Sequence, residues 1–220
     1  MPHRFEKALE ELKTRLLAMG ALAESMIQQS IMLMEDRKTE LIPQIRDAEN
    51  EVNRFEREID NEVVRLIGVY TPVASDLRFL LMATRINGAL ERIGDLTENI
   101  CDHFEGLLQR DLLKPKTELS TMARLAQKML EGSLNAFVEQ SESMAVEVMK
   151  QDDELDELNH QIFRDLLSQM YDEPQSIRRA MGQILMARAF ERIGDMAVNI
   201  AEDVAYLVLG KDVRHVKALW

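Results

Sequence analysis

The pentapeptide Glu-Arg-Ile-Gly-Asp occurs twice in this chain, at residues 91–95 and again at residues 191–195. The sequence around it repeats too. A shift of 103 positions aligns Met26 with Met129 and Ile59 with Ile162, and a shift of 100 aligns the two pentapeptides. A long internal repeat predicts two copies of one structural unit. This constraint limits the fold more than any other feature of the sequence.

The composition predicts that each unit is helical. Leu, Met, Glu, Ala and Arg dominate, aromatic residues make up only 5%, and the alternation typical of strands is absent. Prolines at 72, 115 and 174 separate segments with apolar residues at helical spacing, and Pro43 lies near the start of one of them. The pattern predicts six helices at about 5–35, 39–69, 75–109, 118–139, 142–171 and 176–209. We therefore expect an all-α fold of two tandem three-helix bundles related by a pseudo-twofold repeat, spanning 1–112 and 113–220.

Charge and cysteine content restrict the function and the location. The net charge of −12 disfavours nucleic-acid binding and suits cations or basic partner surfaces. Cys101 is the single cysteine, so the chain cannot form an internal disulfide. The charged start lacks the apolar segment of a signal peptide, and no apolar run approaches about 18 residues. We expect a cytoplasmic protein without direct membrane insertion.

The repeated pentapeptide places two carboxylates on one helix face, because Glu91 and Asp95 are four residues apart. Two interpretations stay open at this point. The acids may be solvated or paired with arginines, or they may form part of a site. Gly94 and Gly194 lie in mid-helix, where glycine costs up to about 1 kcal/mol against alanine. Close helix packing or a bound ion would explain them.

The expected helix hairpins bring further acids to the same level. With turns near Pro72 and Pro174, Glu49 lies opposite Asp95, and Asp152 lies opposite Asp195. Clustered carboxylates require raised pKa values, neutralising arginines or a bound cation. Oxygen ligands suit Mg, Ca, Mn or Fe. A Cys/His zinc site is excluded by composition, and the Glu-x-x-His pattern of ferritin-like di-iron sites occurs only once, at Glu157.

No sequence motif points to catalysis. A nucleophile elbow, a phosphate-binding glycine loop and a dinucleotide fingerprint are all absent. We interpret Cys101 as an ordinary helical residue, and His103 and His215 as surface residues. We expect the C-terminal stretch LGKDVRHVKALW to be a frayed end.

Three features together resemble the PhoU family of bacterial regulators of phosphate uptake, over nearly the whole chain. They are the Glu-x-x-x-Asp motif in both repeats, the stretch TPVASDLRFLLMATRI before the first copy, and the segments ENEVNRFE at 49–56 and DDELDELN at 152–159. The resemblance implies a cytoplasmic adaptor rather than an enzyme. It would act on the ATPase subunit of a phosphate ABC transporter and on a phosphate-sensing histidine kinase, repressing both uptake and the phosphate regulon when phosphate is plentiful.

The resemblance also implies metal binding, because members of the family carry iron or zinc clusters, manganese or magnesium on these motifs. It assigns the metal role to Glu91, Asp95, Glu191 and Asp195, with Glu49 and Asp152 as partners on the second helix of each repeat. Glu49 stands where the family favours Asp, so the two sites would differ. A carboxylate-metal enzyme and a metal-independent adaptor remain as alternatives, and the apolar helix faces are compatible with a monomer or a homodimer.

Overall fold

The computed structural model describes residues 2–108, 112–113 and 116–210, and all regular structure within these residues is helical. The helices are α1 (Pro2–Asp36), α2 (Leu41–Tyr70), α3 (Ala74–Glu105), α4 (Lys116–Glu139), α5 (Glu142–Lys150), α6 (Asp152–Asp172), the 3₁₀ turn η1 (Pro174–Ser176) and α7 (Ile177–Leu209). The predicted all-α fold is confirmed. Pro115 and His215 lie outside the described residues, and the division at 112/113 stays a prediction.

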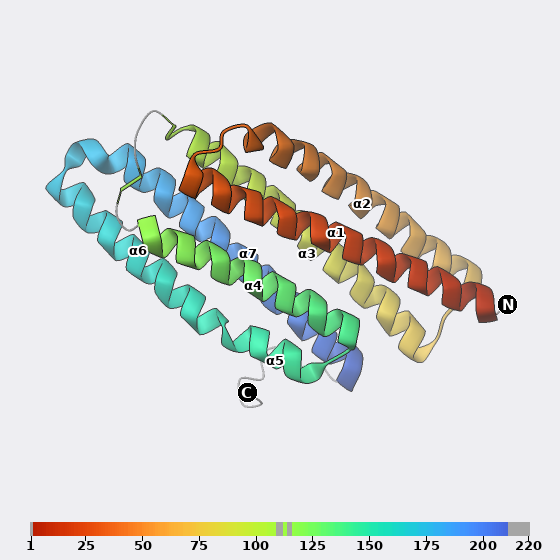
Figure 1. Ribbon diagram of the computed structural model, residues 1–220. Coiled ribbons are helices and arrows are strands. Elements are labelled where there is room, and N and C mark those ends of the chain that lie inside the picture. Colours follow the sequence, from red (N-terminus) through yellow and green to blue (C-terminus); the bar gives the residue numbers. More distant parts are fainter. Residues whose placement is uncertain (1, 109–111, 114–115, 211–220) are drawn as a thin grey trace.

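The helices form two bundles side by side. In the first bundle α1, α2 and α3 pack on one another, and in the second α4, α5 and α6 pack on α7. The bundles join through the α3–α7 and α1–α4 contacts. Figure 1 shows α1 and α4 on the near side of the molecule, with α3 and α7 behind them.

The hairpin turns lie where the prolines predict them. Thr71 ends α2 in the left-handed conformation (φ 46°), and its N–H donates to the Ile67 carbonyl just before Pro72. In the second repeat Pro174 begins the 3₁₀ turn that leads from α6 into α7. Proline fits such positions because it fixes φ and has no N–H to leave unpaired.

The fifth predicted helix, 142–171, is wrong in one respect, because it divides at Gln151 into α5 and α6. The Gln151 side chain donates to the Glu147 carbonyl at 3.0 Å. That carbonyl is the one its own N–H would reach in an α-helix, and the N–H donates instead to the Val148 carbonyl. The side chain thus competes with the helix ladder.

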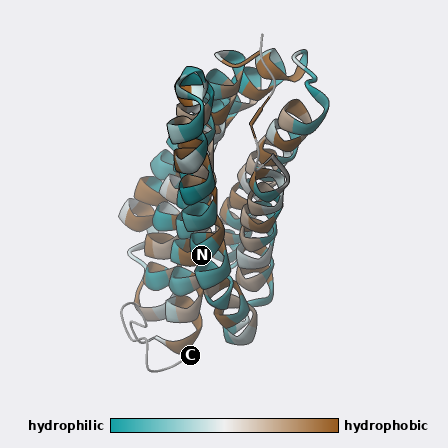
Figure 2. Cartoon of the chain, turned by 90° about the vertical axis from the view of Figure 1, so that its left-hand side faces the viewer, coloured by the Kyte–Doolittle hydropathy of each residue, from teal (hydrophilic) through white to brown (hydrophobic). Residues whose placement is uncertain are grey.

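A single apolar core runs through both bundles. Met26 and Met129, equivalent in the two repeats, are both completely buried. Buried Ser30 and Ser133 are equivalent as well, and each donates to the carbonyl three residues earlier. Figure 2 shows hydrophobic and hydrophilic residues alternating along the helices, as amphipathic packing requires.

Helix α1 contains a longer apolar stretch than we expected from the sequence. Among the described residues, the helix from His3 to Asp36 is long and apolar enough to cross a membrane by length and composition, but half of its most apolar window is buried inside the molecule. Buried helices of globular proteins also pass this test, so the finding is weak evidence for a span.

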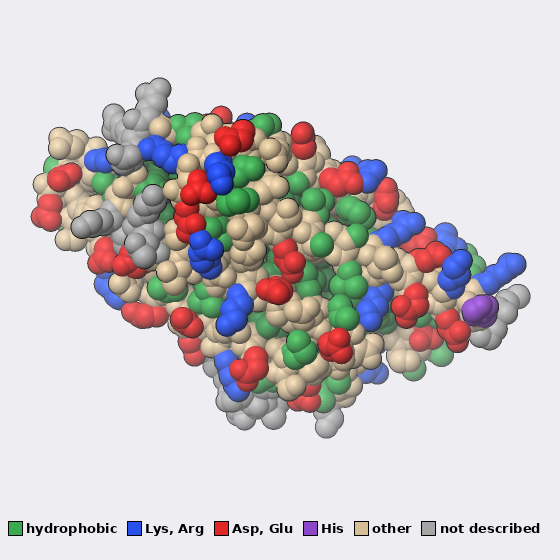
Figure 3. All heavy atoms as spheres, viewed as in Figure 1, with side chains coloured by type: hydrophobic (Ala, Val, Ile, Leu, Met, Phe, Trp, Pro, Cys, Tyr) green, Lys and Arg blue, Asp and Glu red, His purple; other side chains and the backbone are tan. Residues whose placement is uncertain are grey.

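On the face that α1 and α4 present, acidic and basic side chains are intermingled (Figure 3).

Candidate carboxylate site

The central glycines are explained by helix packing. A Cβ on Gly94 would lie 3.2 Å from Cγ1 of Val52 on α2, and a Cβ on Gly194 would overlap Cδ2 of Leu155 on α6. Val52 and Leu155 are equivalent under the 103-residue shift, so each repeat inserts one apolar side chain of its second helix against its glycine. An ion is therefore not needed to account for these glycines.

The two motifs meet across the α3–α7 seam. A groove of about 400 Å³ lies there, and its lining includes Arg92 with Arg192, Asp95 with Asp195, and Leu96 with Met196. The members of each pair are 100 residues apart, so the groove straddles the pseudo-twofold axis. The third helices thus bring both copies of the motif to one surface.

A second groove of about 500 Å³ runs between α6 and α7. It contains both motif acids of the second repeat, Glu191 and Asp195, together with Asn159, His160, Phe163, Arg188 and Arg192. Glu191 and Asp195 are both half-buried there.

In the first repeat Glu91 is half-buried and Asp95 is exposed. Glu49 is buried, with 8% of its surface exposed, and its carboxylate accepts a hydrogen bond from the Asn53 amide. The two repeats therefore differ, because one holds its second-helix acid buried against an amide and the other carries Asp152 half-buried at the equivalent position.

Burial and mutual repulsion act on these carboxylates in both repeats. Burial raises the pKa of Glu91, and the charges of Asp95 and Glu56 raise it further. Burial raises the pKa of Glu191, and the Asp156 charge adds to this effect. The pKa of Asp195 is raised by burial and then by Glu191 and Asp156. The part of these shifts that comes from neighbouring carboxylates would decrease if a positive charge lay among them.

Three acids outside the predicted set belong to these clusters. Asp156 exerts the largest charge effect on Glu191, ahead of Asp152. Glu56 acts on Glu91, and burial followed by the charge of Glu49 raises the pKa of Glu98. The helical register of the hairpin carries the signal for Asp156, because 156 and 191 lie level when the turn is at Pro174.

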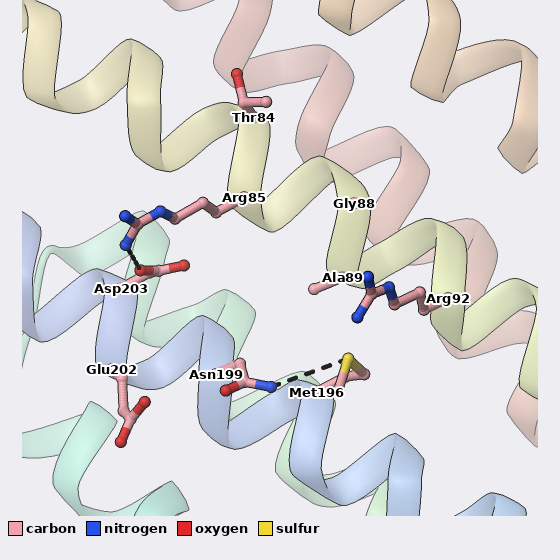
Figure 4. A pocket seen from close by; sticks show the side chains of 9 residues that line it. All are labelled: Thr84, Arg85, Gly88, Ala89, Arg92, Met196, Asn199, Glu202 and Asp203. Carbon is pink, nitrogen blue, oxygen red and sulfur yellow. Dashed lines mark hydrogen bonds and ion pairs between the residues drawn. The ribbon is translucent and has the colours of Figure 1, made fainter. Parts of the chain in front are cut away.

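The arginines do not simply neutralise the motif. Arg85 pairs with Asp203 of α7 at 3.1 Å, across another groove of about 380 Å³ at the α3–α7 seam (Figure 4). Within the described part of the chain, no ion pair within 4.0 Å joins Arg92, Arg188 or Arg192 to a motif acid. The charges of Arg192 and Arg188 partly offset the raised pKa of Glu191, and the charge of Arg92 partly offsets that of Glu91.

The donor chemistry fits a hard cation, although the side chains do not surround one point. Among residues 2–108, 112–113 and 116–210, no three His, Cys, Asp or Glu side chains converge closely enough to hold a metal ion. A cation here would require the carboxylates to rotate.

Cys101 has the properties of a core residue. It is buried on α3, and burial raises the pKa of its thiol to about 12, so the thiol stays protonated at neutral pH. His103 lies half-exposed in the last turn of the same helix.

Known proteins match this chain over almost its full length. The sequence pattern of the PhoU domain matches residues 16–104 and 119–204. The phosphate-specific transport system accessory protein PhoU homolog of Pseudomonas aeruginosa is 34% identical over 97% of this chain and 88% of its own length. The Escherichia coli accessory protein PhoU is 30% identical over the same shares.

Solved structures agree with the sequence matches. The crystal structure of PhoU from Pseudomonas aeruginosa superposes with a TM-score of 0.91 at 33% identity, covering 94% of this chain and all of that one. The phosphate transport system regulatory protein PhoU from Streptococcus pneumoniae gives a TM-score of 0.88 at 25% identity, covering 95% of this chain and 99% of that one.

Proposed function

Because this chain belongs to the PhoU domain family and carries the domain twice, we propose that it is an accessory regulator of a phosphate-specific transport system. It works in the cytoplasm as an adaptor, not as an enzyme. It docks on the ATPase subunit of a phosphate ABC transporter and on a phosphate-sensing histidine kinase. When phosphate is plentiful, it lowers uptake and represses the phosphate regulon.

The observation that carries the docking proposal is the groove shared by the two motifs at the α3–α7 seam. The aspartate and the arginine of each copy of the motif line it, so a partner that binds there contacts one surface built from both repeats. A partner that brings basic groups to Asp95 and Asp195 gains charge complementarity, and electrostatic complementarity favours both rate and specificity of association.

We propose further that the carboxylates hold cations, with iron, zinc, manganese or magnesium as candidates. Glu91 and Asp95, with Glu49, form the ligand set of the first repeat, and Glu191 and Asp195, with Asp152, that of the second. A bound cation would supply positive charge that offsets the repulsion among these acids, and would so fix the charge of the docking surface. Asp156 belongs to the second set because of its charge effect on Glu191.

Binding to the purified ATPase subunit tests the docking surface. We expect replacement of Glu91, Asp95, Glu191 and Asp195 by Ala to weaken binding by more than about tenfold, equivalent to about 1.4 kcal/mol. A matched control removes four exposed acids outside the groove: Glu6, Glu10, Asp47 and Glu139. If both variants lose the same affinity, the effect comes from net charge alone. Undiminished binding by the variant that lacks the four motif acids would overturn the proposal.

Metal content tests the cation proposal separately. Protein purified without chelators is measured by mass spectrometry beside the variant that lacks the four motif acids. Metal in the wild type that the variant loses supports the ligand sets. If neither protein contains metal and the variant is folded, the motif acts through protein contacts alone, and the docking proposal is tested only by the binding experiment.

A further inference from the structure

The groove between α6 and α7 contains donor side chains that the rest of the protein does not engage. We call it the α6–α7 groove, and its donors are Arg188 and Arg192 of α7 with Asn159 and His160 of α6. Within the described ranges of the chain, these four side chains form no hydrogen bond and no ion pair. They are therefore available to a bound molecule.

The register of the hairpin brings these donors together. The two helices are antiparallel, and residues whose numbers sum to 348 lie level, so Arg188 lies level with His160 across the groove. Arg192 follows Arg188 by four residues, on the same face and about 6 Å further along the helix. The donors thus form a strip about one helical turn long, and such a strip suits an anion with several oxygens.

An aromatic ring lies at one end of the strip. Phe163 lines the same groove, three residues from His160 and one turn closer to the tip of the hairpin. Its side chain is 41% exposed, although large apolar side chains are usually buried. An exposed ring beside donors offers a flat apolar surface on which a planar ligand ring can stack.

Carboxylates lie at the other end of the strip. Glu191 and Asp195 are half-buried in the groove and lie one turn apart on α7. They would repel a bare anion, but Mg²⁺ is commonly held by one or two carboxylates together with phosphate oxygens of a ligand. The groove therefore presents a ring, donors and carboxylates in that order, which is the order of base, phosphates and metal in a magnesium–nucleotide complex.

The first repeat lacks this arrangement at the equivalent positions. The residues that correspond to Asn159, Phe163 and Arg188 are Glu56, Asp60 and Gly88. The first repeat thus presents four acids and two arginines where the α6–α7 groove has two acids and two arginines. A Cβ on Gly88 would meet no atom within 4 Å, so the fold leaves room for a side chain there without needing one. The donors and the ring of the second repeat are therefore not a requirement of the fold.

The dimensions of the groove favour a ligand larger than a phosphate ion. Its volume of about 500 Å³ lies within the usual range of small-molecule pockets, about 300–1,000 Å³. Phe163 lies level with residue 185, and the ten residues from there to Asp195 span about 15 Å of α7. A phosphate ion would contact the donors alone and leave the ring uncovered, whereas an extended nucleotide reaches from the ring to the carboxylates.

We propose that the α6–α7 groove binds a nucleoside di- or triphosphate as its magnesium complex. The base stacks on Phe163, and Arg188, His160 and Arg192 donate to phosphate oxygens. The magnesium ion arrives with the nucleotide and offsets the repulsion between its phosphates and Glu191 and Asp195, in a chain whose net charge is −12. The proposal needs neither a cation in the free protein nor the transport role, so each can fail without the other.

Equilibrium dialysis of the full chain against labelled ATP in magnesium buffer tests the site. We expect saturable binding of one ATP per chain, weakened at least about tenfold in Arg188→Ala, because this change removes a charged donor to phosphate. The matched control is Arg178→Ala, which removes another exposed arginine of α7 outside the groove and should bind normally. Absence of saturable binding at millimolar ATP would overturn the proposal, as would equal binding by the two variants.

Pyrophosphate separates the phosphate contacts from the stacking of the base. Phe163→Ala should weaken ATP binding at least about fivefold and leave competition by pyrophosphate unchanged, because only the base touches the ring. Leu167→Ala, at another exposed apolar position on α6, is the control and should change neither. A wild type that binds pyrophosphate as tightly as ATP would overturn the assignment to a nucleotide.

Photolabelling locates the site without any substitution. Light-activated 8-azido-ATP should label the tryptic peptide 151–164, which contains both His160 and Phe163, and excess ATP should block the labelling. Labelling confined to other peptides, or labelling that excess ATP does not block, would contradict the proposed site. Circular dichroism confirms that each variant used in the dialysis is folded.

Discussion

At the scale of single residues, the glycines of the repeated motif show what a sequence can and cannot decide. The cost of a glycine in mid-helix predicts that something lies close to Gly94 and Gly194. It does not distinguish an ion from a backbone or a side chain, because that depends on which residue the facing helix presents. In the structure the close neighbours are the side chains of Val52 at Gly94 and Leu155 at Gly194.

Alanine at these two glycines should therefore have different effects. Gly194→Ala places a methyl group on completely buried Leu155 and should lower the free energy of unfolding by about 1–3 kcal/mol. A Cβ at Gly94 would lie 3.2 Å from Val52, so the better helix propensity of alanine offsets most of the crowding. The free energy of unfolding of Gly94→Ala should therefore change by no more than about 1 kcal/mol. Urea unfolding measures both. Gly88→Ala, with no atom within 4 Å, is the control and should stabilise. Equal losses at 94 and 194 would contradict this account.

The raised pKa of Glu191 predicts that removing its charge stabilises the metal-free protein. A carboxylate whose pKa is raised on folding destabilises the native state at pH values above that pKa. The destabilisation disappears at lower pH, because the carboxyl group is then protonated in both the folded and the unfolded protein. Glu191→Gln should raise the melting temperature at pH 7, by an amount equivalent to a few tenths of a kcal/mol, and by less at pH 4. Glu154→Gln, at an exposed position on α6, is the control. A lower melting temperature for Glu191→Gln at pH 7 would contradict the prediction.

At the scale of helices, periodicity and prolines predict every long helix to within a few residues, except for the break at Gln151. The break was not predictable because it depends on a side-chain amide competing for one carbonyl, and Gln is otherwise a good helix former. The same limit applies to the site. Asp156 and Glu157 both lie level with Glu191 in the sequence register, and in the structure Asp156 is the acid with the largest charge effect on Glu191.

One buried side chain holds Leu113, in the segment between the repeats, against α7. Gln183 on α7 is completely buried, and its amide accepts from the Leu113 N–H at 2.6 Å and donates to the Leu113 carbonyl at 3.1 Å. Gln183→Leu leaves both backbone groups unsatisfied and should cost about 1–3 kcal/mol. Hydrogen exchange at the Leu113 amide should rise at the same time. Gln175→Leu, at an exposed position, should change neither quantity, and unchanged exchange in Gln183→Leu would show that the connection is held elsewhere.

At the scale of the whole molecule, the repeat divides the sequence but not the core. One apolar cluster includes buried residues from both bundles, and α3 packs on α7 while α1 packs on α4. The bundles also interact electrostatically. Burial raises the pKa of Glu24 of α1, and the charge of Glu131 of α4 raises it further. Two units that share a core in this way lose apolar contacts on both sides when either one opens.

The shared core predicts that the two repeats unfold together. We expect one thermal transition by calorimetry, with the calorimetric and van't Hoff enthalpies equal, because neither bundle keeps its apolar faces covered without the other. An isolated half spanning residues 1–112 should expose the α1 and α3 faces and bind a hydrophobic dye or self-associate. Two resolved transitions, or an isolated half that melts cooperatively as a monomer, would mean that each repeat is an independent domain. The α3–α7 groove would then be a hinge between domains instead of a fixed docking surface.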